Sequence, residues 1–195
     1  DFSIGDPKEE KDPMFADRIE KAVRNRASAG YPIFGGEPEF KKICAKYMKN
    51  RFGIEFNPDT EICITNGIKT AVDYFASVVI SNGDYSVCPI PTYPPYINNT
   101  KDCGGKAILL PLNEKNNFLM EFETISKDLL KKTKIIWINY PNSPTGAVAP
   151  LNYYKKLAKW AEENDIIIAS DEGAYIDIYY DDDDKPVSIF QAKDN

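Results

Sequence analysis

The stretch KIIWINYPNSPTG, Lys134–Gly146, indicates the fold class more clearly than any other part of the chain. Its first half contains the continuous apolar run Ile135–Ile138, and its second half is a polar loop stiffened by Pro141 and Pro144. A continuous apolar run is typical of a strand that is covered on both faces, as in a parallel sheet. The loop either joins two elements or holds a ligand at the end of the strand.

Strand-like and helix-like segments alternate along the rest of the chain. The spacing of apolar residues predicts helices over 12–27, 38–51, 67–80, 122–132 and 151–164, with a short helix between 90 and 106. Strands are predicted over 61–65, 85–90, 106–112, 134–139 and 165–170. This alternation predicts an α/β fold of three layers, α/β/α, in which helices cover both faces of a mostly parallel sheet. In such sheets, ligands bind at the carboxyl ends of the strands.

The composition excludes several classes of function. The formal net charge of −6 argues against nucleic acid or an anionic membrane as a partner, and we expect neither a membrane span nor a signal peptide. Histidine is absent, which excludes Ser-His triads and His-based zinc sites, and we expect no metal site. Cys44 and Cys63 lie in apolar segments, so we expect buried free thiols in a reducing compartment. The acidic run 181–185 is interpreted as a solvated turn.

The stretch TNGIKTA, Thr65–Ala71, places a glycine between a predicted strand and a predicted helix. A helix N-terminus offers free N–H groups and positive potential, and both suit a phosphate. Gly67 would let the backbone approach a ligand closely. The alternative is an ordinary helix start that is capped by Asn66.

Aromatic and acidic side chains follow two further strands. Pro89–Tyr96, PIPTYPPY, has four prolines that fix where its tyrosines point, and a rigid ring suits stacking on a flat ligand as well as packing in a core. Asp171 and Glu172 follow the run IIIAS. A carboxylate at the end of a buried strand needs a partner, which is either a cationic ring nitrogen or a neighbouring turn. With the loop after Ile138, these stretches supply the phosphate cradle, stacking surface, donors and anion that pyridoxal 5'-phosphate requires.

Over essentially its whole length, the chain resembles the fold-type I, class I and II aminotransferases that use pyridoxal 5'-phosphate. The resemblance rests on six motifs in the order of the family: SIGDPKE, YPIFGGEPEFKKICAKY, TNGIKTAV, PIPTYPPY, NYPNSPTGAVAP and IIASDEGAY. Two of them, SIGDPKE and TNGIKTAV, are most similar to the branch that contains LL-diaminopimelate aminotransferases and related aspartate-type enzymes.

The resemblance implies a set of binding residues. Gly5 would lie near the carboxylate of the substrate, and Tyr31 would reach the cofactor phosphate of the partner subunit in a homodimer. The backbone of Gly67, Ile68 and Lys69 would hold the phosphate of its own subunit.

The resemblance also implies contacts to the cofactor ring. Tyr93 would stack on the ring, and Asp171 would pair with its nitrogen and keep it protonated. A tyrosine three residues after the aspartate usually binds the phenolic oxygen, but Tyr175 comes four residues after Asp171. A bulge at Gly173 could restore its direction, or Glu172 could take the place of the aspartate.

A second departure from the family concerns the loop after Ile138. The family usually has Asn directly before Pro-Thr-Gly, where it binds the phenolic oxygen. This chain has Ser143 there, with Asn142 one place earlier. Ser is shorter than Asn but can donate one hydrogen bond. Either Ser143 or Asn142 is therefore expected to contact the cofactor.

The expected activity is transfer of an amino group between an amino acid and a 2-oxo acid by a cytoplasmic homodimer. The family's Schiff-base lysine and C-terminal substrate-binding arginine are expected after Asn195, so we expect this chain to be an incomplete piece that is inactive alone. Residues 1–36 are predicted to form the N-terminal arm and small-domain side, and 37–195 the cofactor-binding large domain. The alternatives are a lyase or decarboxylase on the same cofactor, and a binding protein that kept the fold without the chemistry.

Overall fold

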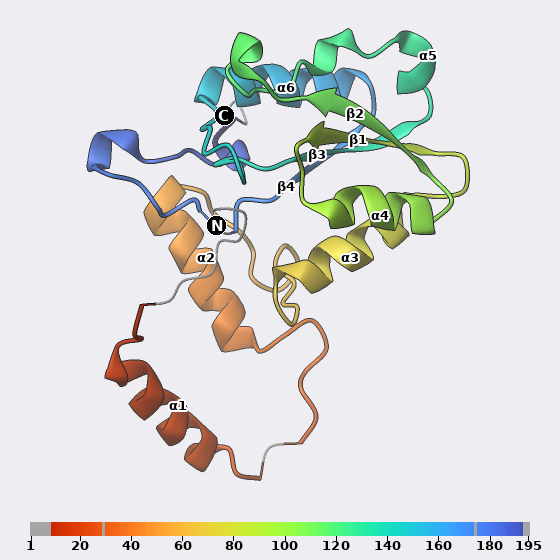
Figure 1. Ribbon diagram of the computed structural model, residues 1–195. Helices are drawn as coiled ribbons and strands as arrows, with labels where there is room; N and C mark the ends of the chain where they lie inside the picture. Colours follow the sequence, from red (N-terminus) through yellow and green to blue (C-terminus); the bar gives the residue numbers. More distant parts are fainter. Residues whose placement is uncertain (1–8, 29, 174, 193–195) are drawn as a thin grey trace.

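The computed structural model of the protein describes residues 9–28, 30–173 and 175–192 (Figure 1). The helices are α1 (Pro13–Asn25), α2 (Pro38–Phe52), α3 (Ile68–Val79), α4 (Pro94–Asp102), α5 (Lys127–Leu130) and α6 (Leu151–Glu163). The strands are β1 (Tyr85–Ile90), β2 (Lys106–Pro111), β3 (Thr133–Ile138) and β4 (Ile167–Ser170). Short 3-10 turns occupy Glu114–Asn116, Phe122–Thr124, Asp182–Asp184 and Ile189–Ala192.

The four strands form one parallel sheet in the order β2-β1-β3-β4. Helices α3 and α4 cover one face of the sheet, and α5 and α6 lie on the other (Figure 1). The predicted three-layer α/β/α fold is therefore confirmed for this part of the chain. β3 lies inside the sheet between β1 and β4, which explains why its apolar run is continuous rather than alternating.

The side chains of β3 divide between two cores because successive residues of a strand point to opposite faces. Ile136 and Ile138 belong to the core beneath α6, where Leu157 is wholly buried. Ile135 and Trp137 belong to the core beneath α3 and α4. Both faces of β3 are therefore covered by side chains and excluded from water.

Two predicted elements are wrong. Residues 61–65 form no strand, because the structure places no neighbouring strand beside them among its described residues; Ile64 N–H donates a single isolated bond to Gly35 O at 3.2 Å. Residues 122–132 are not one helix but a 3-10 turn followed by the single turn α5. The prediction of buried thiols also fails: Cys63 is free but exposed, and Cys44 is free but only half-buried.

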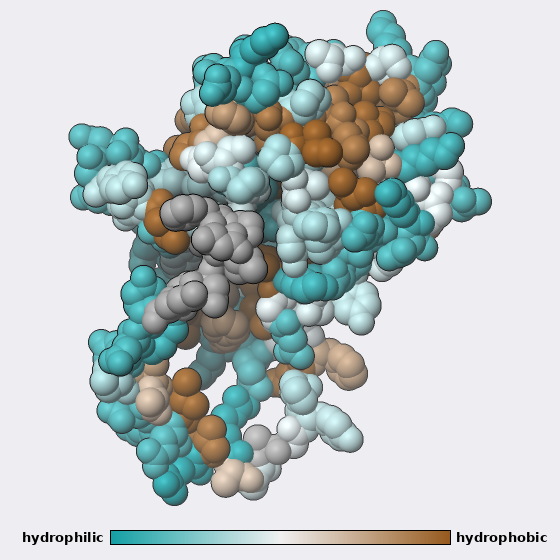
Figure 2. Space-filling view, viewed as in Figure 1, coloured by the Kyte–Doolittle hydropathy of each residue, from teal (hydrophilic) through white to brown (hydrophobic). Residues whose placement is uncertain are grey.

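The N-terminal part stands apart from the sheet (Figure 1). None of the residues of α1 is buried, and its apolar side chains, Met14, Phe15, Ile19 and Val23, are exposed (Figure 2). The segment that follows leads directly into α2, which packs closer to the body of the molecule. Within the described ranges, no helix is both long and apolar enough to cross a membrane.

Candidate functional site

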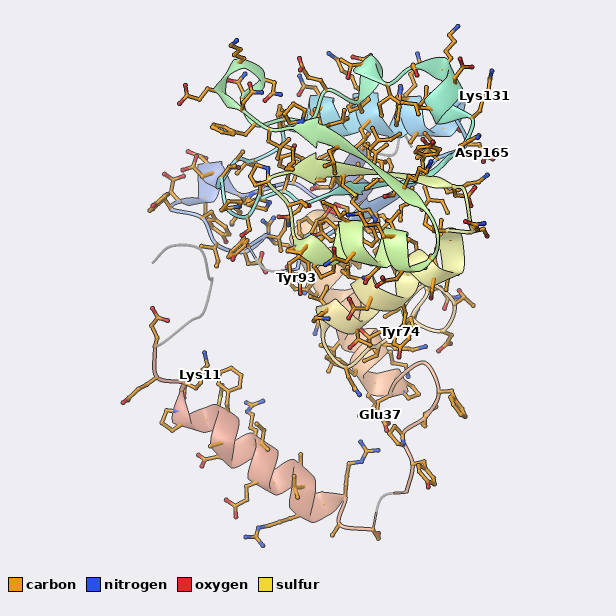
Figure 3. The ribbon with its side chains drawn as sticks, turned by 45° about the vertical axis from the view of Figure 1, so that its right-hand side comes forward. Lys11, Glu37, Tyr74, Tyr93, Lys131 and Asp165 are labelled. Atoms are coloured by element: carbon orange, nitrogen blue, oxygen red, sulfur yellow. The ribbon has the colours of Figure 1, made fainter. Side chains whose placement is uncertain are left out.

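The candidate site lies at the edge of the sheet where the parallel strands end. Figure 3 shows Tyr93 at this edge, at the start of α4, whereas Lys131 and Asp165 lie at the opposite edge, just before β3 and β4 begin. Loops after β1, β3 and β4 meet here with the start of α3. This is the edge at which parallel sheets bind their ligands.

Asp171 follows β4 directly, and its backbone N–H donates to the carbonyl of Ile138 at 2.8 Å. Its carboxylate accepts a hydrogen bond from the Tyr96 hydroxyl, at 2.6 Å to Oδ2. Within the described ranges, the other oxygen, Oδ1, has one long contact, of 3.4 Å, with the N–H of Gly173. Asp171 therefore reaches the strand end with one oxygen oriented by the protein and the other able to accept a further donor.

Tyr96 and Tyr93 have different environments, although the sequence alone allowed either ring to stack on a flat ligand. Tyr96 is only 1% exposed and stacks on Trp137 with ring centroids 4.7 Å apart and an interplanar angle of 6°. Burial, together with the charge of Asp171, raises the pKa of Tyr96 far above its usual value, so its hydroxyl remains a proton donor. Tyr93 is 39% exposed and meets Tyr96 edge to face. Tyr93 is therefore the ring that is accessible to a ligand.

The side chain of Glu172 makes its hydrogen bonds elsewhere than with Tyr93 and Tyr96. Its Oε1 accepts hydrogen bonds from the Ser170 hydroxyl at 2.8 Å and from the backbone N–H of Ile189 at 2.9 Å. The carboxylate thus fastens the segment around 189 to the end of β4. This arrangement favours Asp171 over Glu172 as the residue that faces a ligand.

The loop after β3 separates its two candidate side chains. Asn142 is buried: its Oδ1 accepts from the Thr145 hydroxyl at 2.7 Å, and its Nδ2 donates to the Asn139 carbonyl at 3.2 Å. Ser143 is exposed, and its hydroxyl makes no hydrogen bond with any residue that the structure describes. The amide of Asn142 is occupied within the loop, so Ser143 is the residue that is free to donate.

Asn139 is a site residue that the sequence reasoning missed. Its Nδ2 donates to the carbonyl of Asp171 at 2.7 Å, and its Oδ1 accepts from the backbone N–H of Ser143 at 2.9 Å. One amide thereby joins the ends of β3 and β4. The signal that could have found it was its position as the first polar residue after the apolar run.

The start of α3 is not capped by a side chain. Gly67 is the N-cap residue, with a φ of 81° that favours glycine, so Asn66 is not the cap. Lys69 donates along the helix to Asp73 at 2.5 Å. No described side chain caps the first backbone N–H groups of the helix. A Cβ on Gly173 would lie 2.8 Å from the Ile68 side chain, so the helix start is in contact with the end of β4.

The remaining predicted site residues lie in different parts of the molecule. Tyr175 lies in the turn after β4 and, with Ser143, lines a hollow of about 750 Å³. Tyr31 is fully exposed on the N-terminal segment and lines a second hollow, in which Asn66 also takes part. Gly5 lies outside the described residues. In the described part of the chain, Cys, Asp and Glu form no group of three or more that could hold a metal ion.

Comparison with known proteins shows the family. The family model described as aminotransferase class I and II matches residues 1–195. The chain belongs to the class I and II aminotransferase family. An LL-diaminopimelate aminotransferase of Aquifex aeolicus (strain VF5) is 41% identical over 192 residues, which are 98% of this chain and 49% of that protein. One from Dehalococcoides mccartyi (strain ATCC BAA-2266) is 38% identical over 191 residues, again 98% of this chain and 49% of that protein.

Solved structures of aminotransferases share the fold. Apo-BacF from Bacillus subtilis matches with a TM-score of 0.90 and 31% identity, over 98% of this chain and 50% of that chain. An aminotransferase from Neisseria meningitidis Z2491 matches with a TM-score of 0.89 and 29% identity, over 98% and 48% of the two chains. The chain thus spans about half the length of the class I and II aminotransferases that it matches.

Proposed function

We propose that the protein carrying this chain is a pyridoxal 5'-phosphate-dependent aminotransferase that moves an amino group between an amino acid and a 2-oxo acid. The observation that carries the proposal is the half-buried carboxylate of Asp171, oriented by the buried Tyr96 beside an uncapped helix start. The names of the related proteins support an amino-group donor of the diaminopimelate type.

The described residues fit this cofactor. The uncapped N-terminus of α3 presents N–H groups that suit its phosphate, and Gly67 has no neighbouring atom within 4 Å of an added Cβ, which leaves room for close approach. Asp171 has a carboxylate oxygen to offer a protonated ring nitrogen, and Tyr93 offers an accessible ring face.

Each residue has a role that follows from its position. Pyridoxal 5'-phosphate, when bound, supplies an electron sink for breaking bonds at the amino-acid α-carbon. Asp171 would hold a proton on the ring nitrogen, and Tyr96 and Asn139 would hold Asp171 in place. Ser143 and Tyr175 would donate to the phenolic oxygen of the ring. The backbone N–H groups of Gly67, Ile68 and Lys69 would bind the phosphate.

Other parts of the proposal concern the whole protein. The Schiff-base lysine and the substrate-binding arginine would come from residues outside this 195-residue chain, so the chain alone would not transfer amino groups. The protein would be a cytoplasmic homodimer, with Gly5 near the substrate and Tyr31 reaching the partner's cofactor phosphate. Residues 1–36 would form the N-terminal arm and small-domain side, and 37–195 the large domain. The exposed apolar side chains of α1 are consistent with a further covering partner.

The activity is tested with the whole protein and the 195-residue chain in parallel. Each is loaded with pyridoxal 5'-phosphate and given an amino donor, LL-diaminopimelate or aspartate, together with 2-oxoglutarate. We expect the whole protein to form glutamate and the 195-residue chain to form none. Carbon dioxide release without glutamate would indicate a decarboxylase instead, and failure to bind the cofactor would refute the proposal.

Ser143 and Asn142 are distinguished by two alanine variants of the whole protein. Ser143→Ala is expected to raise the pH midpoint of the cofactor's visible absorbance by up to about one unit, because a hydrogen bond to the anionic oxygen is lost. Asn142→Ala is expected to lower the free energy of unfolding by about 1–3 kcal/mol, because buried loop partners lose their bonds. Absorbance titration and denaturant unfolding measure the two effects. The opposite pattern would assign the cofactor contact to Asn142.

A further inference from the structure

The loop that carries Tyr175 is not held by the sheet. After β4 ends at Ser170, the described residues of this loop, 175–187, form no strand. Its internal backbone bonds are local, such as Ile178 N–H to Tyr175 O at 3.0 Å and Asp184 N–H to Asp181 O at 3.2 Å. The position of Tyr175 therefore depends on contacts with other elements, which include the burial of its neighbour Ile176 and side chains that reach the loop from outside.

Arg51, in the last turn of α2, makes the main connection to this loop. Its Nε donates to Asp177 Oδ1 at 2.9 Å, and its Nη2 donates to the carbonyls of Ile176 at 3.3 Å and Pro186 at 3.0 Å. Ile176 and Asp177 follow Tyr175 directly, whereas Pro186 lies on the returning arm. A single guanidinium group thus ties both arms of the loop to one helix.

The surroundings of Arg51 hold this group in place. Its side chain is 16% exposed, and its guanidinium lies 4.6 Å from the ring centroid of Phe52 and 5.7 Å from that of Tyr179. One turn earlier on α2, the Tyr47 hydroxyl donates to the second oxygen of Asp177 at 2.5 Å. The planar guanidinium of Arg51 is largely buried and donates to several fixed acceptors at once. The ammonium group of a lysine cannot reproduce this geometry.

The ionic state of Asp177 supports a lasting contact. Burial raises its pKa, but the hydrogen bonds from Tyr47 and Arg51 and the positive charge of Arg51 outweigh this effect and lower the pKa below its usual value. Asp177 is therefore ionised at neutral pH and remains paired with Arg51.

We propose that Arg51 is a positioning residue for Tyr175. It acts through Ile176 and Asp177, and it orients the Tyr175 hydroxyl towards the phenolic oxygen of the cofactor. The inference rests on the proposed function, because it assumes that Tyr175 contacts the cofactor. It adds that α2, which begins at Pro38 soon after Tyr31, links the N-terminal segment to the loop of the site.

The test uses the whole protein loaded with pyridoxal 5'-phosphate and measures the pH midpoint of the cofactor's visible absorbance. Tyr175→Phe is expected to raise this midpoint by about one unit, because a donor to an anionic oxygen is lost. Arg51→Met is expected to raise it by about half a unit or more, because Tyr175 remains present but is misplaced. Arg51→Lys, which keeps the charge, is expected to resemble Arg51→Met.

Lys49→Met is the matched control, because Lys49 lies on the same helix and pairs with Glu55 on the exposed surface. It is expected to leave the midpoint unchanged. The double variant Arg51→Met/Tyr175→Phe is expected to match Tyr175→Phe alone, because both changes remove the same contact. If Arg51→Met does not fold, Asp177→Asn removes the charge pair with a smaller change in volume and is expected to give a shift of the same sign.

Three results overturn the proposal in different ways. If Tyr175→Phe raises the midpoint but Arg51→Met, Arg51→Lys and Asp177→Asn do not, Arg51 does not position Tyr175, and the proposed function stands. If Tyr175→Phe itself has no effect although the cofactor binds, Tyr175 does not contact the phenolic oxygen, and the role of Arg51 is refuted with it. Additive shifts in the double variant would show that Arg51 acts independently of Tyr175.

Discussion

Replacing Asp171 by Asn in the whole protein is expected to lower kcat/KM for amino transfer by about 10²–10³-fold, the size of effect seen when one preorganised electrostatic contact is removed. The neutral amide keeps the shape of the carboxylate and can still accept from Tyr96, but it has no charge to hold a proton on the ring nitrogen. Steady-state kinetics with the amino donor and 2-oxoglutarate measure the loss.

The neighbouring carboxylate provides the control for this prediction. Glu172→Gln retains an oxygen that can accept from Ser170 and Ile189, so kcat/KM is expected to change by less than about twofold. A large loss in Glu172→Gln with little loss in Asp171→Asn would reverse the assignment and place Glu172 on the ring nitrogen.

Replacing Trp137 by Ala is expected to lower the free energy of unfolding by about 3–5 kcal/mol, the range for removing a large buried aromatic side chain. Trp137 is 3% exposed, stacks on Tyr96 and meets Phe75 edge to face. The same change removes the surface against which Tyr96 is held, so the contact from Tyr96 to Asp171 is expected to weaken as well. Denaturant unfolding of the whole protein measures the first effect.

Two further variants isolate the cause of this loss. Tyr74→Ala removes an exposed aromatic ring from α3 and is expected to change the free energy of unfolding by less than about 0.5 kcal/mol. Trp137→Phe keeps a ring for stacking and removes an indole N–H that has no partner among the described residues, so its cost is expected to be well below that of Trp137→Ala. Equal losses in the Ala variants of Trp137 and Tyr74 would contradict the packing argument.

The sequence predicted most of the helices and strands close to their observed bounds. Tyr85–Ile90 is a strand with the predicted bounds, and the helix predicted over 151–164 is α6. The prediction failed for 61–65, because a strand exists only when a neighbouring strand completes its hydrogen bonds, and the described residues provide none there. It also failed within 122–132, where extended backbone at Ile125 and Ser126 separates a 3-10 turn from α5.

For the candidate site, the sequence indicated loops at the carboxyl ends of the strands but left pairs of nearby residues open. The two residues of each pair are close together in the sequence and similar in chemical character. The pairs are Asp171 and Glu172, Ser143 and Asn142, and Tyr93 and Tyr96. The structure separates them by their partners: Glu172 bonds to Ile189, Asn142 bonds within its own loop, and Tyr96 is buried against Trp137.

By itself, the sequence determined the fold class and the edge of the sheet at which the candidate loops gather. Apolar periodicity and turn residues are local properties, and in a parallel sheet they bring every strand's carboxyl end to one side. Only the tertiary structure decided which side chain of each pair is already engaged by other residues, and that Arg51 reaches the Tyr175 loop from more than a hundred residues away. Such directions depend on hydrogen-bond partners and packing surfaces that are distant in the chain, which no local pattern encodes.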